Sequence, residues 1–121
     1  MATPTRTPEL IYKIASAEVA AAARDSGTFT GMPIDRKDGF IHFSTAAQLP
    51  QTLSLHFRGQ GDLVLMAIRS RDVGGTLRWE PSRGGQLFPH VHGDFPMSAV
   101  AWTAPIAVAA GGTCTLPEAV R

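Results

Sequence analysis

The chain has 121 residues, of which 44% are hydrophobic and 17% are charged, and its formal net charge is +1. These values predict one globular domain with no room for a separate cofactor domain. Acidic and basic residues are interspersed, so no basic face argues for a nucleic-acid partner. The single cysteine, Cys114, excludes an intramolecular disulfide. No signal-peptide pattern and no apolar run of about 20 residues is present, so we expect a cytoplasmic protein without a membrane span.

The N-terminal segment predicts a short strand that follows a loose lead. Residues 1–9 form the lead, and residues 10–14 alternate in the manner of a strand. Lys13 is the charged member of this strand. We expect its side chain to extend to solvent from a sheet edge, the alternative being a role for its ammonium group in a site.

A helix and a loop are predicted next. Ser16 is a suitable N-cap for a helix that runs to about Arg24 and is stopped by Gly27. Residues 27–39 are predicted to be a loop, because glycine and proline punctuate them. We expect the charge cluster at residues 35–38 to be solvated, the alternative being a lid over a ligand.

Residues 40–45 are predicted to form a hydrophobic strand that carries ionisable and hydroxyl groups. Because side chains alternate along a strand, His42 and Ser44 share one face and the other face packs in the core. Thr45 and Gln48 have the spacing of a helix capping box, so the strand is predicted to end at a helix start. A helix start offers backbone amides that would suit an anionic or polar ligand beside His42 and Ser44.

The middle of the chain predicts a helix followed by a buried strand. The helix spans residues 45–58 with a fresh start at Pro50, and His56 is expected on its surface or at the core edge. Residues 63–69 are a continuous apolar run of strand length, which predicts a central strand covered on both faces.

The C-terminal half is predicted to be mostly strands, at residues 76–80, 87–92 and 98–108. The last of these is expected at a sheet edge because it contains Pro105. Gly111 and Gly112 could close a hairpin to residues 113–116, and residues 117–121 form a short tail. With helices early and most strands late, the predicted fold class is α+β.

Three polar pairs at i, i+2 spacing lie on three of the predicted strands. If the strands line one cleft, the pairs supply a carboxylate, imidazoles, a hydroxyl and a guanidinium to one active site. The alternative is that Arg78 and Glu80 are exposed and that the histidines are core residues whose polar atoms are all hydrogen-bonded. The pairs are His42 with Ser44, Arg78 with Glu80, and His90 with His92.

Glu80 is the strongest catalytic candidate, because it stands next to Trp79 and a carboxylate beside apolar bulk can orient a substrate hydroxyl. A metal-dependent enzyme is an alternative, since His90 and His92 could point at one ion with Glu80 or His42 as a third ligand. No metal is expected in the preferred interpretation. Cys114 is expected to be an inert packing thiol.

Several segments together resemble one family, DUF952, over residues 10 to 116. In chain order they are Ile-Tyr-Lys-Ile at 11–14, Asp-Gly-Phe-Ile-His-Phe-Ser-Thr at 38–45, Asp-Leu-Val-Leu at 62–65, Trp-Glu at 79–80 and Leu-Phe-Pro-His-Val-His-Gly at 87–93. The resemblance implies one domain over residues 10–116. It also implies an ADP-ribosyltransferase-like split β-sheet with two early helices and a cleft that holds NAD in active enzymes.

By this resemblance Glu80 would bind a ribose hydroxyl and stabilise an oxocarbenium-like state, while His42 and Ser44 position the nicotinamide ribose. Lys13 or Arg78 could meet the diphosphate. The implied catalytic residues are Glu80, His42 and His90, and the implied ligand-binding residues are Lys13, Ser44, Thr45, Arg78 and His92.

The resemblance implies a small-molecule partner, with NAD as a substrate and no resident cofactor. The leading functional hypothesis is ADP-ribosyl transfer or NAD glycosidic cleavage. The alternatives are a non-catalytic domain that binds a nucleotide or small metabolite, the metal-dependent enzyme, and a protein-interaction role.

Overall fold

A computed structural model describes residues 7–120, with the exception of the Arg83 side chain. Most of the predicted N-terminal lead, residues 1–6, and the last residue of the predicted tail lie outside the described residues. The elements in chain order are β1 (Leu10–Ser16), α1 (Ala17–Ser26), β2 (Thr28–Phe29), α2 (Pro33–Asp38), β3 (Ile41–His42), α3 (Leu49–His56), β4 (Leu63–Arg69), β5 (Leu77–Pro81), β6 (Leu87–Val91), β7 (Phe95–Pro96) and β8 (Val100–Ile106), with three short 3-10 turns between them.

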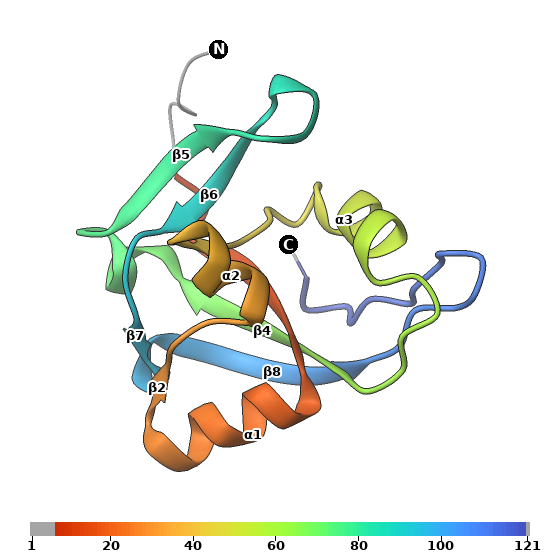
Figure 1. The fold of residues 1–121 in the computed structure, drawn as a ribbon, viewed down its shortest axis with the longest axis horizontal. Coiled ribbons are helices and arrows are strands. Elements are labelled where there is room, and N and C mark those ends of the chain that lie inside the picture. Colours follow the sequence, from red (N-terminus) through yellow and green to blue (C-terminus); the bar gives the residue numbers. More distant parts are fainter. Residues whose placement is uncertain (1–6, 121) are drawn as a thin grey trace.

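The strands form two three-stranded antiparallel sheets and one short two-stranded pair. The sheets have the orders β1-β4-β8 and β3-β6-β5, and β2 pairs with β7. The two larger sheets are joined by one bridge, in which Tyr12 and Ser44 exchange both backbone hydrogen bonds at 2.9 Å. In Figure 1 the β5–β6 hairpin extends away from β4 and β8, with α2 beside its base. Helices and antiparallel sheets together confirm the predicted α+β class.

The central buried strand is β4, as predicted. It pairs with β1 on one side and β8 on the other. Met66 and Ile68 pack into one core cluster, while Leu65 and Ala67 pack into the second cluster on the opposite face. This double coverage explains why the segment is apolar throughout. β8 is an edge strand, as expected from Pro105.

The predicted ends of the first helix are confirmed by its caps. Ser16 accepts a hydrogen bond from the Val19 amide at 3.1 Å, and Gly27 adopts the left-handed conformation that ends the helix. The third helix, α3, is shorter than the predicted span of residues 45–58, because residues 45–48 form a turn and the helix ends at His56. The predicted fresh start is confirmed, since Pro50 lies in the first turn of α3.

The loop predicted at residues 27–39 is wrong, because this segment contains β2 and the six-residue helix α2. Pro33 begins α2, where its missing N–H costs nothing. The Asp35 carboxylate accepts the Met32 amide at 2.7 Å and so closes the first turn. Gly39 ends the helix in the left-handed conformation, with φ of 85°. The described residues therefore hold three α-helices instead of the two expected.

The hairpin predicted after Gly112 is also wrong. Residues 109–113 make a turn, in which the Ala109 amide bonds to the Thr113 carbonyl at 2.8 Å, but residues 114–120 contain no strand. The segment packs Leu116 and Val120 against the second core cluster instead. Within residues 7–120, no helix is both long enough and apolar enough to cross a bilayer.

Candidate functional site

A cavity of about 500 Å³ opens where the two larger sheets separate. This volume is within the range typical of small-molecule sites. β1, α2, β3, α3 and the β5–β6 hairpin all contribute to its wall. The lining residues are Tyr12, Lys13, Ile14, Met32, Ile34, Asp38, His42, Phe43, Ser44, Thr52, His56, Phe57, Ser82, Phe88 and His90.

Asp35 is the buried anchor of the α2 side of this cavity, although it does not line the cavity itself. Its side chain accepts hydrogen bonds from the Met32 amide at 2.7 Å and from the His42 amide at 3.0 Å. Burial raises the pKa of Asp35, but the hydrogen bond from the His42 ring and the charge of Lys13 outweigh it and lower the pKa to about 2. The predicted solvation of this charge cluster is therefore wrong for Asp35, which is 2% exposed.

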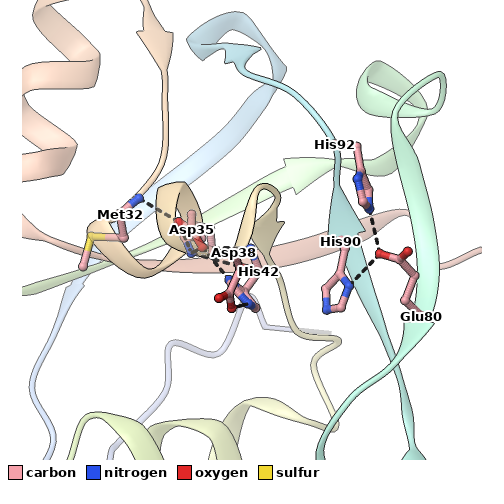
Figure 2. Close-up of polar contacts among 8 residues, drawn as sticks. Met32, Asp35, Asp38, His42, Glu80, His90 and His92 are labelled. Carbon is pink, nitrogen blue, oxygen red and sulfur yellow. Dashed lines mark hydrogen bonds and ion pairs between the residues drawn. The ribbon is translucent and has the colours of Figure 1, made fainter.

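His42 is held at both ring nitrogens by carboxylates of α2 (Figure 2). Its Nδ1 lies 2.7 Å from Asp35 Oδ1, and its Nε2 lies 2.9 Å from Asp38 Oδ2. The two contacts fasten α2 to β3, so neither nitrogen is available to a ligand in this arrangement.

Lys13 is buried, and its predicted extension to solvent is wrong. β1 is not open on its outer side, because Tyr12 bridges to Ser44 there, and the Lys13 residue is 4% exposed. Its Nζ lies 2.9 and 2.8 Å from the two oxygens of Asp35 and donates to the His42 carbonyl at 3.0 Å. Burial lowers the pKa of Lys13, and the attraction of Asp35 opposes that shift.

Glu80, His90 and His92 form a second polar cluster on the β5–β6 hairpin. Glu80 Oε1 lies 2.9 Å from His90 Nδ1 and 2.7 Å from His92 Nε2, and both rings point toward it in Figure 2. The hydrogen bonds with His92 and His90 lower the pKa of Glu80. The carboxylate is therefore ionised at neutral pH and acts only as an acceptor, so His90 Nδ1 carries the proton.

The other ring nitrogen of His90, Nε2, is consequently unprotonated when the ring is neutral. Burial lowers the pKa of His90, against the opposing effect of Glu80, so the ring is mainly neutral at pH 7. The second ring nitrogen points away from Glu80 in Figure 2 and has no hydrogen-bond partner among the described residues. His90 is also one of the residues that line the cavity.

The two clusters lie side by side because His42 and His90 are directly opposite on β3 and β6. Their ring centroids are 5.5 Å apart. The ring of Phe40 lies against both, with centroid distances of 4.7 Å to His42 and 4.3 Å to His90. Phe40 therefore restricts the rotation of both imidazoles.

Hydroxyl groups form another part of the cavity wall. Ser44 Oγ and Thr52 Oγ1 are 3.1 Å apart, and this contact joins the segment after β3 to α3. Thr45 and Gln48 make the predicted reciprocal bonds, at 3.0 Å from the Thr45 amide and 3.3 Å from the Gln48 amide. The Gln48 and Leu49 amides also donate to the Thr45 carbonyl. The amides of Thr45, Gln48 and Leu49 are therefore occupied and are not available to the ligand expected there.

The structure thus brings together five of the eight predicted site residues in the cavity wall or directly behind it, and three lie elsewhere. Arg78 is exposed, and its guanidinium donates to the carbonyls of Gly75 and Leu77. Thr45 supports the turn before α3, and His92 is on the outer side of Glu80. The five are Lys13, His42, Ser44, Glu80 and His90.

Asp35 and Asp38 were not among the predicted site residues, although their charge cluster was considered as a lid, and the cavity-lining Thr52 was not predicted either. The signal that could have located the two aspartates is the proline at position 33 with an acid two residues later, which is typical of a helix first turn. His90, His92 and Glu80 converge on one oxygen instead of surrounding an ion position. Among the described residues, no group of three or more His, Cys, Asp or Glu side chains is arranged to hold a metal.

Comparisons with known proteins agree with one another. The family model described as "Protein of unknown function (DUF952)" matches residues 14–103. The crystal structure of protein CC0527 from Caulobacter crescentus is 42% identical and has a TM-score of 0.83, over 88% of this chain and 94% of that one. The solution NMR structure of the same protein has a TM-score of 0.77, over 88% and 91% of the two chains. No curated protein matches the chain.

Proposed function

The chain belongs to the DUF952 family of proteins of unknown function, and we propose that it is an acid–base enzyme that binds a small molecule in the cavity and uses His90 as its general base. The observation that carries the proposal is the 2.9 Å hydrogen bond between His90 Nδ1 and Glu80 Oε1. A carboxylate that holds one imidazole nitrogen fixes the tautomer and leaves the other nitrogen able to accept a proton.

The other groups in the wall have supporting roles in this proposal. His42 is a positioning residue, because its nitrogens are engaged by Asp35 and Asp38. Ser44 and Thr52 offer hydroxyl oxygens that can accept from or donate to a polar ligand group. A base of lowered pKa is well suited to act near neutral pH, where it remains unprotonated.

A second candidate is the NAD-consuming transferase or glycohydrolase that the family resemblance implied. The position of the cavity at the opening between two sheets favours it, together with a carboxylate on a later strand. In this candidate Glu80 would bind a ribose hydroxyl through Oε2, because Oε1 already contacts two histidines. The ligand would be NAD or ADP-ribose.

The test combines ligand screening with two variants. Labelled protein would be titrated with nucleosides, small amides, NAD and ADP-ribose, while backbone amide signals are followed by NMR. The proposal expects a ligand that shifts the signals of Ser44 and His90 and is converted to product. His90→Gln should then reduce turnover by at least about 100-fold, because a general base contributes that much or more.

The control variant is Glu118→Gln, at an exposed position in the C-terminal tail. It should leave binding and turnover unchanged. A ligand that binds at His90 without being converted would support the non-catalytic binding domain instead. Turnover that survives in His90→Gln would contradict the proposed base.

A further inference from the structure

We infer that the part of the ligand that enters the cavity carries no negative charge. This inference rests on the proposed function and gives its substrate class. It follows from the charges in and behind the cavity wall and from how fully they are already paired.

The ammonium group of Lys13 is already engaged by two residues. It donates hydrogen bonds to Asp35 Oδ1 at 2.9 Å and to the His42 carbonyl at 3.0 Å, and Asp35 Oδ2 lies 2.8 Å away as an ion-pair contact. Its charge is also balanced by the buried carboxylate that it contacts. Lys13 therefore does not act as a phosphate or carboxylate receptor.

No other lysine or arginine of the described wall compensates for this, and the His42 ring is already held by the carboxylates of Asp35 and Asp38. Lys13 is the only lysine or arginine among the described side chains that line the cavity. Arg36 on α2 donates to Thr30 at 2.9 Å, and Arg78 donates to backbone carbonyls of its own strand region. An anionic group would therefore lose its water without gaining a charged partner, which is costly.

Two carboxylates make the cavity still less suitable for an anion. Asp38 is part of the wall, and Glu80 lies directly behind His90. Both carboxylates contact histidines, but each still repels a negative charge placed nearby in a partly hydrated site, and we expect this to lower affinity about fivefold. The position is therefore electrostatically biased toward neutral or cationic groups.

The remaining wall defines the body of the ligand. Six apolar side chains contribute to it, and they favour a flat or branched apolar group. An uncharged O–H or N–H at one end would reach His90 Nε2, which lacks a described partner. The apolar residues are Ile14, Met32, Ile34, Phe43, Phe57 and Phe88.

The test uses three probes of nearly equal shape, namely benzamide, benzoate and benzamidine. Dissociation constants would be measured by NMR from the ring signals of His90. We expect benzamide and benzamidine to bind at least about fivefold more tightly than benzoate. In Asp38→Asn the difference in affinity between benzoate and the other two probes should become smaller. Asp25→Asn, at an exposed position of α1, should leave that difference unchanged.

Benzoate binding that equals or exceeds benzamide binding would overturn the inference and leave the proposed base untouched. Perturbation of His90 by the uncharged probe, followed by failure of His90→Gln to affect any turnover, would leave the inference standing and contradict the proposed catalysis. If no probe shifts His90 at millimolar concentration, both are wrong.

Discussion

Asp35 and His42 are joined by two hydrogen bonds to one carboxylate oxygen. Oδ1 of Asp35 accepts the His42 backbone amide at 3.0 Å and lies 2.7 Å from His42 Nδ1. The pair therefore fixes both the backbone and the ring of His42 relative to α2. It also lowers the pKa of Asp35, since the folded state favours the ionised carboxylate.

The first prediction concerns acid stability. Burial opposes the shift, but hydrogen bonding and Lys13 lower the pKa of Asp35 from 3.8 to about 2. Its contribution is complete above about pH 4 and is lost as the pH falls toward 2, because the unfolded chain binds the proton first. The loss should be about 2 kcal/mol. Urea unfolding at pH 7, 4 and 2.5 should show it.

The matched variants for that experiment are Asp35→Asn and Asp25→Asn. Asp35→Asn should be less stable at pH 7 and should lose correspondingly less stability on acidification. Asp25→Asn replaces an exposed carboxylate, and its stability should change with pH in the same way as that of the parent. An Asp35→Asn curve parallel to that of the parent across this pH range would show that Asp35 is not the group responsible.

Lys13→Met is predicted to be strongly destabilising. It removes the cation from a buried pair and leaves Asp35 with an uncompensated charge. Breaking a buried pair in this way lowers the free energy of unfolding by about 3–5 kcal/mol. Lys37→Met changes the chain's other lysine, which is exposed on α2, and should stay within about 0.5 kcal/mol of the parent. Chemical denaturation of both variants measures the difference, and equal stabilities would refute a structural role for the pair.

Gln48→Ala should weaken the connection between the α3 turn and β6. The side chain accepts from the Thr45 amide at 3.0 Å and donates to the Leu87 carbonyl at 2.8 Å, in a nearly buried position. Losing both bonds should cost about 2 kcal/mol. Gln51→Ala, one turn further and exposed, is the control. Equal melting temperatures for the two variants would contradict the proposed role of the Gln48 side chain.

Glu80→Gln should lower the pKa of His90 further. Burial already lowers this pKa, and the hydrogen bond and charge of Glu80 act in the opposite direction. Removing the charge therefore removes the support for the protonated ring. An NMR titration of the His90 ring signals should show the decrease, with Glu118→Gln as the unaffected control. A rise in the pKa would mean that Glu80 does not face His90 in solution.

Much of the scaffold could be predicted because the responsible signals are local. The apolar run of β4 needs cover on both faces, and Ser16 and Gly27 cap α1 by hydrogen bonding and backbone conformation alone. Alternation also placed His42 and Ser44 on the face that meets the cavity. These features depend on neighbours within a few residues.

The missed features depend on distant partners or short elements. α2 has six residues, too few for a helical periodicity to be recognised, and its glycine and proline flanks are also typical of loops. Lys13 is buried because Asp35, 22 positions later, meets it in the fold. The contact between Glu80 and His90 follows from the β5–β6 register, which residue patterns did not specify.

The most direct test of the proposed base is the tautomer of His90 at pH 7, measured from the side-chain nitrogen signals of labelled protein. We predict a neutral ring protonated at Nδ1, with Nε2 unprotonated, and loss of this preference in Glu80→Gln. A ring protonated at Nε2, or at both nitrogens, would contradict the proposed base, because Nε2 could then not accept a proton from a ligand.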